Sequence, residues 1–531
     1  MEWTPTHVTY RQTGFFSKII IDYLDRSESL APFYAHPVSS AGLLSALQAR
    51  QRSPVNREVL VSVLKAQYNS VGPAPLVHQH IDALLEENTF TVVTAHQPAI
   101  FTGPLYFIYK ILHTIRLARS LSDQWEQYCF VPVFYMGSED ADLDELGNFY
   151  LDGEKIVWDA RQTGAVGRMT PKGLEKILDR IEGEFSVQPF GPELVHLVKT
   201  AYLESPDIQT ATFRLLHSLF AEYGLVVLIA DNANLKRLMI PVFEDDLFRQ
   251  TPTHVVSQTI GRLSQHYKVQ ANPRPINLFY LKDDLRGRIE RVGDDFKVHD
   301  SRLVFGEAEI RKELHTHPER FSPNVILRGL YQETILPNIA FIGGGGETAY
   351  WLELKDLFDH YKTPFPVLIL RNSFLLVEKQ WKEKAARAGL TAAGLFCPEE
   401  ALINELVKKE SAQQLSLEKE IAEAQGYYEK IKGLARSVDP TLVQHVEALE
   451  TKALEPLREL EKKLLKAEKR KFGDRQRQLH ALKSALFPLN GLQERIGNFM
   501  PWYAARGKEF IADLYRYSGT LEQEFVVLEE H

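Results

Sequence analysis

Five short apolar runs recur along the chain, and each is followed by a polar turn and then by a segment with helical periodicity. They are residues 90–95 (FTVVTA), 130–136 (FVPVFYM), 225–230 (LVVLIA), 338–342 (NIAFI) and 366–370 (PVLIL). Continuous apolar strands that alternate with helices are typical of a parallel sheet buried on both faces. The pattern predicts an α/β fold with a doubly wound, Rossmann-like core, in which ligands bind at the carboxyl ends of the strands.

Two long separations interrupt this alternation, at about 151–223 and about 235–337. Each is long enough for more than one crossover helix, so we interpret both as insertions that cover the site. The first 85 or so residues are mostly helical in pattern, with amphipathic segments at 40–50 and 56–70.

The character of the chain changes at 399–486, which is rich in Glu, Lys, Leu and Ala. Apolar residues there repeat at spacings of three and four, as a coiled-coil seam requires. The linker 433–440 (GLARSVDP) divides the segment into two helices, which predicts an antiparallel hairpin. Residues 487–531 are aromatic and turn-rich, and we expect them to pack back onto a core made of residues 1–398. The seam consists of Leu442, Val446, Leu449, Ala453, Leu457, Leu460, Leu464 and Ala467.

Composition narrows the class of protein. The 531 residues are 44% hydrophobic and 25% charged, which indicates a globular chain of more than one domain. A net charge of −8 argues against binding nucleic acid over the whole chain. Cys129 and Cys397 are too few for a disulfide framework, which favours a reducing cytoplasm. With no signal peptide and no apolar run near the ~18 residues that span a bilayer, we expect no membrane association.

The first candidate for chemistry is the turn after the first predicted strand, AHQPAIFTGPLYFIYK. Thr102 is suited to cap the following helix, and free N–H groups at a helix start attract phosphate or carboxylate. Tyr106 and Lys110 lie four residues apart, on one helical face. An ordinary capped helix with a lysine extended along its surface explains the same pattern. The candidates in this turn are His96, Gln97, Thr102, Gly103, Tyr106 and Lys110.

The second candidate is the acid run 138–145 (SEDADLDE) after the second strand. Glu139, Asp140 and Asp142 have the chemistry to bind Mg²⁺ together with substrate phosphates, or to act as a base. An acid-rich first helical turn, stabilised by the helix dipole, accounts for the run equally well.

The third candidate is a run of four glycines followed by a glutamate, immediately before a helix. Consecutive glycines cost conformational entropy, so close approach of the backbone to a ligand is the better explanation. The run has neither the Walker A lysine nor the spacing of a dinucleotide fingerprint. Its candidate residues are Gly343, Gly344, Gly345, Gly346, Glu347 and Tyr350.

The fourth candidate is Arg371-Asn372-Ser373, which follows the last apolar strand. An arginine that leaves a buried strand needs an anionic partner. A ligand and a neighbouring acid fit that requirement equally.

In their order along the chain, these segments resemble the bacillithiol-biosynthesis cysteine-adding enzymes, a family of cysteine ligases. The stretches that carry the resemblance span about 91–503. Where many members have glycine, histidine and proline, this chain has Ala95, Ala141 and Gly345. The matching stretches are TAHQPAIFTGPLYFIYK, PVFYMGSEDADLDELGNFYL, GGGGETAYWLELKDLF, PVLILRNSFLL, EPLRELEKKLLKAEKRK and LFPLNGLQERIGNFMPWY.

The resemblance implies a Rossmann-like core with two connecting-peptide insertions and a coiled coil that supports a homodimer. It also implies addition of cysteine to the amine of glucosaminyl malate, with formation of an amide. A free carboxylate needs activation for that reaction, so we expect ATP or another nucleotide, with Mg²⁺ possible at Asp140 and Asp142 and no tightly bound cofactor.

The hypothesis of cysteine ligation assigns roles to the candidate residues at the carboxyl ends of the predicted strands. The catalytic candidates are His96, Lys110, Glu139, Asp140 and Asp142. The remaining candidates bind substrate or nucleotide. Two alternatives stay open: a class I synthetase-like nucleotidyl transferase that acts on another amino acid, and a non-catalytic ligand-binding scaffold organised by the coiled coil.

Overall fold

The computed structural model describes residues 2–411 and 415–531, which form two compact units. One unit is made of His7–Leu375 and Gly491–Val527, and the other contains Leu376–Asn490 and both chain ends. The first unit is therefore built from two separate stretches of sequence. Its boundary lies at 375 rather than at the predicted 398, and the C-terminal stretch that joins it begins at 491 rather than 487.

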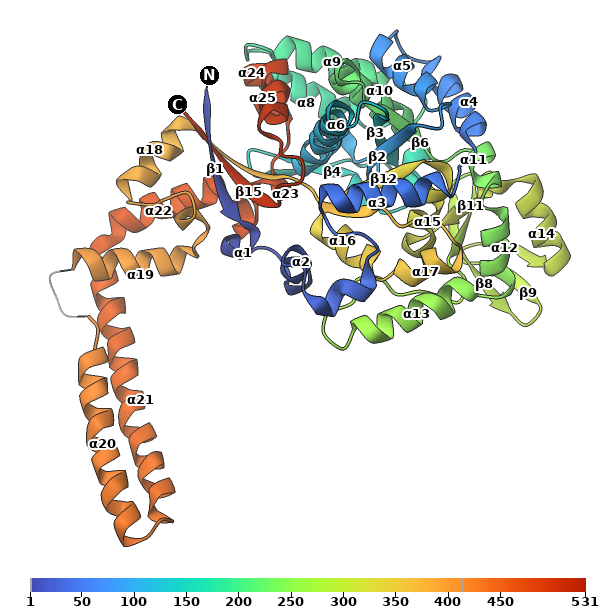
Figure 1. Ribbon diagram of the computed structural model, residues 1–531. Helices are drawn as coiled ribbons and strands as arrows, with labels where there is room; N and C mark the ends of the chain where they lie inside the picture. The colour runs from blue at the N-terminus through green and yellow to red at the C-terminus, as the bar shows by residue number, and fades with distance from the viewer. Residues whose placement is uncertain (1, 412–414) are drawn as a thin grey trace. The chain divides into compact units, whose positions relative to one another are not determined.

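The first unit is organised around a five-stranded sheet in the order β13-β12-β2-β3-β6, in which every neighbouring pair is parallel. The five predicted strands and their parallel arrangement are confirmed (Figure 1). Because β12 and β3 lie on opposite sides of β2, the strand order reverses direction there, which is where ligands bind in such sheets. The strands are β2 Thr89–His96, β3 Cys129–Met136, β6 Val226–Ile229, β12 Asn338–Gly343 and β13 Val367–Leu370.

The sheet is buried because its strands are almost entirely apolar, and helices cover both of its faces. Two of these helices, α3 (Ser40–Gln51) and α6 (Tyr106–Gln124), pack their apolar residues on one cluster of strand side chains. The predicted amphipathic segments of the N-terminal region correspond to α3 and to α4 (Arg57–Tyr68). Core members of the cluster include Leu43, Leu47, Phe90, Val92, Leu117, Ile342 and Ile369.

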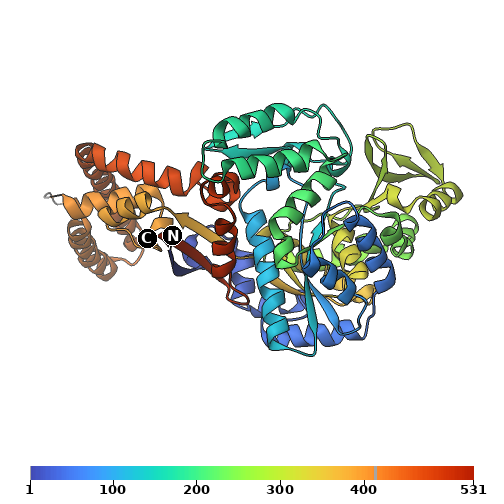
Figure 2. The same ribbon diagram turned by 90° about the horizontal axis from the view of Figure 1, so that it is seen from above.

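The insertion after β3 begins with a short hairpin, β4 (Asn148–Leu151) and β5 (Glu154–Val157), and continues as three helices. The insertion after β6 adds three helices and then a small antiparallel sheet in the order β10-β9-β8-β7-β11. Figure 2 shows this second sheet beside the parallel one and separate from it. Only helices were expected in the insertions, because strands such as β8, LRGRIERV, are too polar to stand out in the sequence. The other α-helices and strands between α8 and α17 are α8 Glu175–Phe185, α9 Gly191–Leu203, α10 Ile208–Phe220, α11 Ala233–Arg237, α12 Ile240–Phe248, α13 Thr251–Leu263, β7 Leu278–Lys282, β8 Leu285–Val292, β9 Asp295–Val298, β10 Val304–Gly306, α14 Glu307–Thr316, β11 Phe321–Pro323, α15 Val325–Ile335, α16 Gly345–Leu352 and α17 Lys355–His360.

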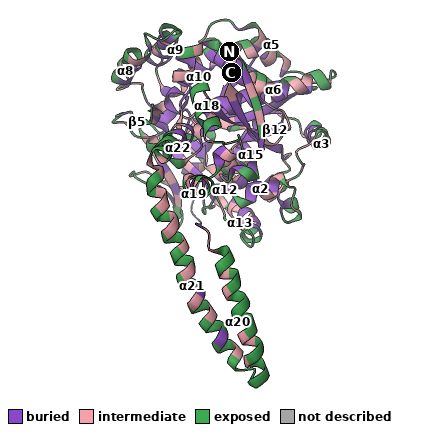
Figure 3. Cartoon of the chain, turned by 90° about the vertical axis from the view of Figure 1, so that its left-hand side faces the viewer, coloured by how far each residue is buried: buried purple, intermediate pink, exposed green. Residues whose placement is uncertain are grey.

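The second unit is mainly helical and contains the predicted antiparallel hairpin. Its arms, α20 (Glu418–Val438) and α21 (Leu442–Lys469), pack along each other and expose most of their other surfaces (Figure 3). The predicted linker at 433–440 is too long, since α20 continues as a helix through Gly433 to Val438. The other helices of this unit are α18 Lys379–Arg387, α19 Glu399–Glu410 and α22 Gly473–Leu486. No helix in the described part of the chain is long and apolar enough to cross a membrane.

Residues 373–377 differ from their prediction as the start of a helix. They form strand β14 (Ser373–Val377), which belongs to a three-stranded sheet in the order β1-β15-β14. All five side chains are buried, and such a fully buried apolar run is compatible with a strand as well as with a helix. The other two strands are β1 Trp3–Thr9 and β15 Glu524–Glu530.

Candidate active site

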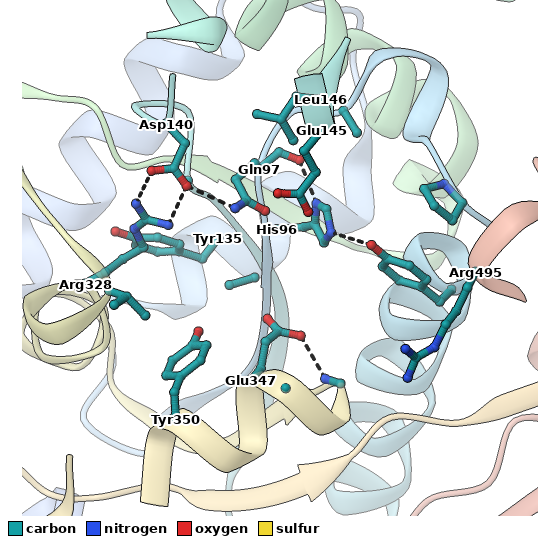
Figure 4. A pocket seen from close by; sticks show the side chains of 18 of the residues that line it. His96, Gln97, Tyr135, Asp140, Glu145, Leu146, Arg328, Glu347, Tyr350 and Arg495 are labelled. Carbon is teal, nitrogen blue, oxygen red and sulfur yellow. Dashed lines mark hydrogen bonds and ion pairs between the residues drawn. The ribbon is translucent and has the colours of Figure 1, made fainter. Parts of the chain in front are cut away.

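A cavity of about 860 Å³ opens at the carboxyl ends of β2, β3 and β12, where the strand order reverses. Its walls come from the turns after these strands, from the start of α16 and from the second insertion, and all belong to the first unit. The predicted residues that line it are His96, Gln97, Tyr106, Asp140, Gly344, Gly345, Gly346, Glu347, Tyr350 and Arg371 (Figure 4).

The turn after β2 does not have the predicted helix cap. Helix α6 begins at Tyr106, and Thr102 is buried with a positive φ of 65°. The N–H groups of Thr102 and Gly103 both donate to carbonyls inside the turn, so neither is free for an anion. From outside the turn, the Nδ2 atom of Asn498 donates to the carbonyls of Phe101 and Gly103, at 3.0 and 2.7 Å. The turn is a closed, supported wall, and Thr102 and Gly103 do not line the cavity.

His96 is held as a neutral side chain at the end of β2. Its Nδ1 donates to the carbonyl of Gln97 at 2.9 Å, so Nε2 is free to accept from the Tyr106 hydroxyl at 3.2 Å. Burial, followed by the charge of Lys110, lowers the pKa of His96 to about 4. A group with that pKa is a weak base at neutral pH, so the geometry favours a binding role for His96.

Lys110 lies beneath the cavity rather than in its lining. The buried Nζ atom donates to Oε2 of Glu347 and to the carbonyl of Ala95, both at 2.6 Å. The same Oε2 atom accepts from the N–H of Gly344 at 2.8 Å. Lys110 therefore ties the end of β2 to the start of α16, and its charge is already balanced within the protein.

In the acid run, Glu139 points away from the cavity into a buried charge cluster. It is ion-paired with Lys236, which is fully buried and also donates to Asp231 at 3.1 Å. Arg168 completes the cluster through two bonds to Asp231, at 2.6 and 2.7 Å. Burial raises the pKa of Glu139, and Lys236 opposes that rise. This arrangement makes Glu139 a structural acid behind the site.

Asp140 lies in the cavity, and its carboxylate is already fully used. Arg328 donates to both of its oxygens, while Arg286 and Gln97 add bonds of 3.1 and 3.0 Å. Although burial raises it, the two guanidinium groups and Gln97 lower the pKa of Asp140 to about 2. A carboxylate with four donors and so low a pKa has little capacity to accept a proton.

The contacts of Asp140 and Asp142 decide whether these two residues can bind the predicted Mg²⁺. Four protein donors occupy Asp140, and the side chain of Asp142 caps α7 (Leu143–Leu146) by accepting from the N–H of Glu145 at 3.1 Å. Among the described residues, no group of three His, Cys, Asp or Glu side chains is placed to hold a metal ion. Asp140 and Asp142 thus do not fit Mg²⁺ in this arrangement.

Glu145, from the end of the same acid run, lines the cavity with a free carboxylate. Its side chain has no hydrogen bond or ion pair with any described residue, and Figure 4 shows it beside Gln97 and His96. Partial burial, then the charges of Asp142 and Asp140, raise its pKa. Glu145 is therefore better suited than Glu139 or Asp140 to accept a proton.

The glycine run faces the cavity at the start of α16. A Cβ added at Gly346 would meet nothing within 4 Å, and one at Gly345 would meet only Ile20 at 3.4 Å. Neither glycine has a positive φ, so packing and backbone conformation do not require glycine there. The open backbone supports the prediction that a ligand approaches this turn, while Gly343, the last residue of β12, lies outside the cavity lining.

Arg371 reaches the cavity with its charge balanced from behind. It donates to Glu494 at 2.7 Å, and its guanidinium lies 5.0 Å from the centre of the Tyr106 ring. Its two predicted neighbours are buried outside the lining: the N–H of Asn372 donates to His113, and the hydroxyl of Ser373 to Glu494. Of the two partners that the sequence left open for Arg371, the structure provides the neighbouring acid.

Several lining residues were not predicted because they are distant in sequence from the strand ends. Arg286 comes from β8 of the second insertion, and Arg328 from α15. Arg495, on the far side of the cavity in Figure 4, belongs to the C-terminal stretch. Their sequence context carries no signal of a site. Glu145 lies in the acid run that was predicted as a candidate, and Arg495 lies in one of the stretches that carry the family resemblance.

Comparison with known proteins gives a consistent family. The Rossmann-like N-terminal domain of the bacillithiol biosynthesis protein BshC matches residues 3–372, and its C-terminal coiled-coil domain matches residues 374–530. A protein of Flavobacterium johnsoniae named as a cysteine ligase, BshC, is 41% identical over 525 residues, which cover 98% of this chain and 99% of that protein. A protein of the same name from Cytophaga hutchinsonii is 42% identical over 481 residues, or 90% of each chain.

Proposed function

The chain belongs to the BshC family of bacillithiol biosynthesis, and from that premise we propose that its cavity joins cysteine to the amine of glucosaminyl malate. The product is an amide, and the protein acts as a carbon–nitrogen ligase. The observation that carries the proposal is the unpaired carboxylate of Glu145 in a cavity whose lining also includes four arginines, Arg286, Arg328, Arg371 and Arg495. Such a site attracts two anionic substrates and keeps one base for the amine.

The bond-forming step follows from this arrangement. The acceptor enters as an ammonium ion, and Glu145 removes a proton to free the nitrogen lone pair. The nitrogen then attacks the carbonyl carbon of an activated cysteine, and the activating group leaves with the electron pair of its C–O bond. The nitrogen loses its second proton as the amide forms. The raised pKa of Glu145 brings its proton affinity closer to that of the substrate amine.

A nucleoside triphosphate is the activating reagent that we propose, since a free carboxylate does not form an amide in water without one. The open glycine backbone at the start of α16 supports this choice, because the free N–H groups and dipole of a helix start attract phosphate. The cationic groups on that side of the cavity, Arg371 and Arg495, would face the same phosphates. ATP is the first nucleotide to test.

We also propose a homodimer formed through the hairpin of α20 and α21. Large apolar side chains remain exposed along it, including Tyr427, Leu434, Val438, Leu449 and Leu460. Exposed apolar surface of this extent on a helical hairpin favours burial against a second copy. Changing Leu449 and Leu460 to Glu should give a monomer in analytical ultracentrifugation, whereas a monomeric wild type would contradict the proposal.

The cytoplasm is the compartment that we propose for this reaction. Both cysteines are free thiols in the structure, and the thiol substrate and the nucleotide are metabolites of a reducing compartment.

Mass spectrometry of the reaction tests the function directly. Purified full-length protein is incubated with cysteine, glucosaminyl malate and ATP, and the expected product is heavier than the acceptor by one cysteinyl residue. Replacing ATP by other nucleoside triphosphates identifies the reagent. Absence of the product with every nucleotide would contradict the proposal. Pyrophosphate exchange dependent on a different amino acid would favour a nucleotidyl transferase instead.

A further inference from the structure

Two arginines and one aspartate form the end of the cavity opposite Arg495. The side chains of Arg286, Arg328 and Asp140 are 10%, 23% and 16% exposed, so all three are largely removed from water. Both guanidinium groups contact the same carboxylate. This end of the cavity therefore has one cation more than it has anions among the described residues.

The other cations near the cavity are balanced differently. Lys110 is paired with Glu347, and Arg371 is paired with the fully buried Glu494, each one to one. Arg495 has no partner among the described residues, but its side chain is exposed, so water screens its charge. An unbalanced cation that is mostly buried is the more costly arrangement, and an anionic ligand would offset that cost.

Arg286 also has hydrogen-bonding capacity that the protein leaves unused. Only its Nη2 atom donates to an acceptor within the described part of the chain, and its Nε atom is buried without one. The guanidinium is 3.8 Å from the centre of the Phe279 ring, a contact that fixes its plane. A fixed, planar fork of donors matches the geometry of a carboxylate.

The acceptor of the proposed reaction carries two carboxylates on its malyl group, and nucleotide phosphates are the competing anions. The glycine backbone of α16 already offers phosphates a helix start, so the arginines of the second insertion remain for the carboxylates. We propose, resting on the proposed function, that Arg286 and Arg328 bind the malyl carboxylates and select an acceptor with a dicarboxylate aglycone.

A cycle of two enzymes and two acceptors tests this assignment. Full-length wild type and Arg286→Gln are compared with glucosaminyl malate and with the methyl glycoside of glucosamine, which has the amine but no carboxylate. We expect Arg286→Gln to lower kcat/KM for glucosaminyl malate by about tenfold or more, as loss of a charged hydrogen bond does, mainly through KM. For the methyl glycoside, kcat/KM should change by less than about twofold.

Other outcomes of this cycle overturn the assignment. An equal loss with both acceptors would show that Arg286 supports the fold of the site rather than the carboxylates. A rise in KM for ATP with no change for glucosaminyl malate would assign the arginine to phosphates. Arg286→Lys keeps the charge without the planar guanidinium, so it should retain part of the preference for glucosaminyl malate over the methyl glycoside. If Arg286→Gln has a lower melting temperature than wild type, the lysine variant takes its place in the comparison.

Calorimetry separates this inference from the proposed function. Titration of L-malate into full-length protein needs no turnover, and we expect binding by wild type that is lost in Arg286→Gln. Binding of L-malate by a wild type that forms no amide would preserve the subsite and reject the ligase. Amide formation with no effect of Arg286→Gln on kcat/KM for glucosaminyl malate would support the ligase and reject the carboxylate subsite.

Discussion

Two neighbouring turns of the sheet began as similar candidates and have different structures. The turn after β2 is closed: His96 is neutral, Lys110 is paired, and Asn498 holds the carbonyls of Phe101 and Gly103. The turn after β3 divides its acids, with one buried behind the site, one held by arginines and one left free. The turn after β2 forms a supported wall of the cavity, whereas the turn after β3 leaves the carboxylate of Glu145 unpaired in the cavity.

This difference shows that residue type says little about function until the partners are known. Glu139, Asp140 and Glu145 are carboxylates within seven positions of one another, but each has different neighbours. The pKa of Asp140 is lowered, whereas those of Glu139 and Glu145 are raised. A group that the protein has already satisfied contributes to positioning, and only an unsatisfied group remains for substrate.

Loss of Lys236, the ion-pair partner of Glu139 in the turn after β3, should have the largest effect on stability. Lys236→Met leaves Glu139 buried without its cation, so the free energy of unfolding in urea should fall by about 3–5 kcal/mol. Lys110→Met is the matched variant in the other turn, and it should cost less because its partner Glu347 is 25% exposed. A double variant Lys236→Met/Glu139→Gln should regain stability. Equal losses for both single lysine variants would show that the buried ion pair of Glu139 is no more important for stability than the partly exposed ion pair of Glu347.

Removal of the free carboxylate should have the largest effect on rate. Glu145→Gln should lower kcat by about a hundredfold or more, the usual contribution of a general base. Wild-type activity should fall as pH drops through the raised pKa of Glu145, because the protonated carboxyl cannot accept a proton, and this decline should be absent from the variant.

Asp144→Asn provides the control for Glu145, since Asp144 is exposed in the same helix and does not line the cavity. Its activity should stay within about twofold of wild type, because a change at an exposed side chain outside the cavity lining has little effect. A loss as large as that of Glu145→Gln would mean that the negative charge of the helix matters rather than one base.

The closed turn should respond to Asn498 through stability. Asn498→Ala removes the donor that two buried carbonyls share, and the free energy of unfolding should fall by about 2 kcal/mol. Asn88→Ala removes an exposed amide that donates to the carbonyl of Gln127, so the same urea titration should show a change below about 0.5 kcal/mol. Similar losses of unfolding free energy for the two variants would show that the bonds from Asn498 do not stabilise the turn after β2.

Among the candidate site residues, His96→Gln should have a small effect on rate, below about tenfold in kcat, because a weak base contributes little. The pKa of His96 is lower in the folded protein, at about 4, than its usual 6.5. The unfolded chain therefore binds the proton first, and this residue's contribution to stability is present above pH 6.5 and lost as pH falls towards 4. The variant should show a shallower loss of stability across that window, with His113 accounting for part of the remainder.

The sequence was sufficient for the parts of the fold that local patterns determine. The five parallel strands follow from continuous apolar runs bounded by polar turns, and the helical hairpin follows from apolar residues spaced three and four apart. The helix predicted after the turn at 371–373 begins only at Lys379, because the apolar run Phe374–Leu376 fits a buried strand as well as a helix. The strands of the second insertion alternate too weakly, and they carry Arg286.

The location of the site could be predicted from the sequence, but the partners of its individual side chains could not. Strand ends and turns indicated where a ligand binds, but whether Glu139 or Glu145 stays unpaired depends on Lys236, which lies far along the chain. Thr102 looked like a helix cap because its residue type and the following Pro104 fit one. Bonds from Asn498 and a positive φ give the turn another shape, and neither is visible in local sequence.

The support that Asn498 gives to the turn after β2 also has a consequence for synthesis of the protein. A ribosome completes His7–Leu375 and then the whole hairpin before it makes Gly491–Val527, which carries Asn498, Glu494 and Arg495. Until that last stretch emerges, Arg371 lacks its buried partner and the turn its outside donor. The nascent chain thus has its cavity completed only after the hairpin has been made, so a chain that terminates within the hairpin lacks a finished cavity.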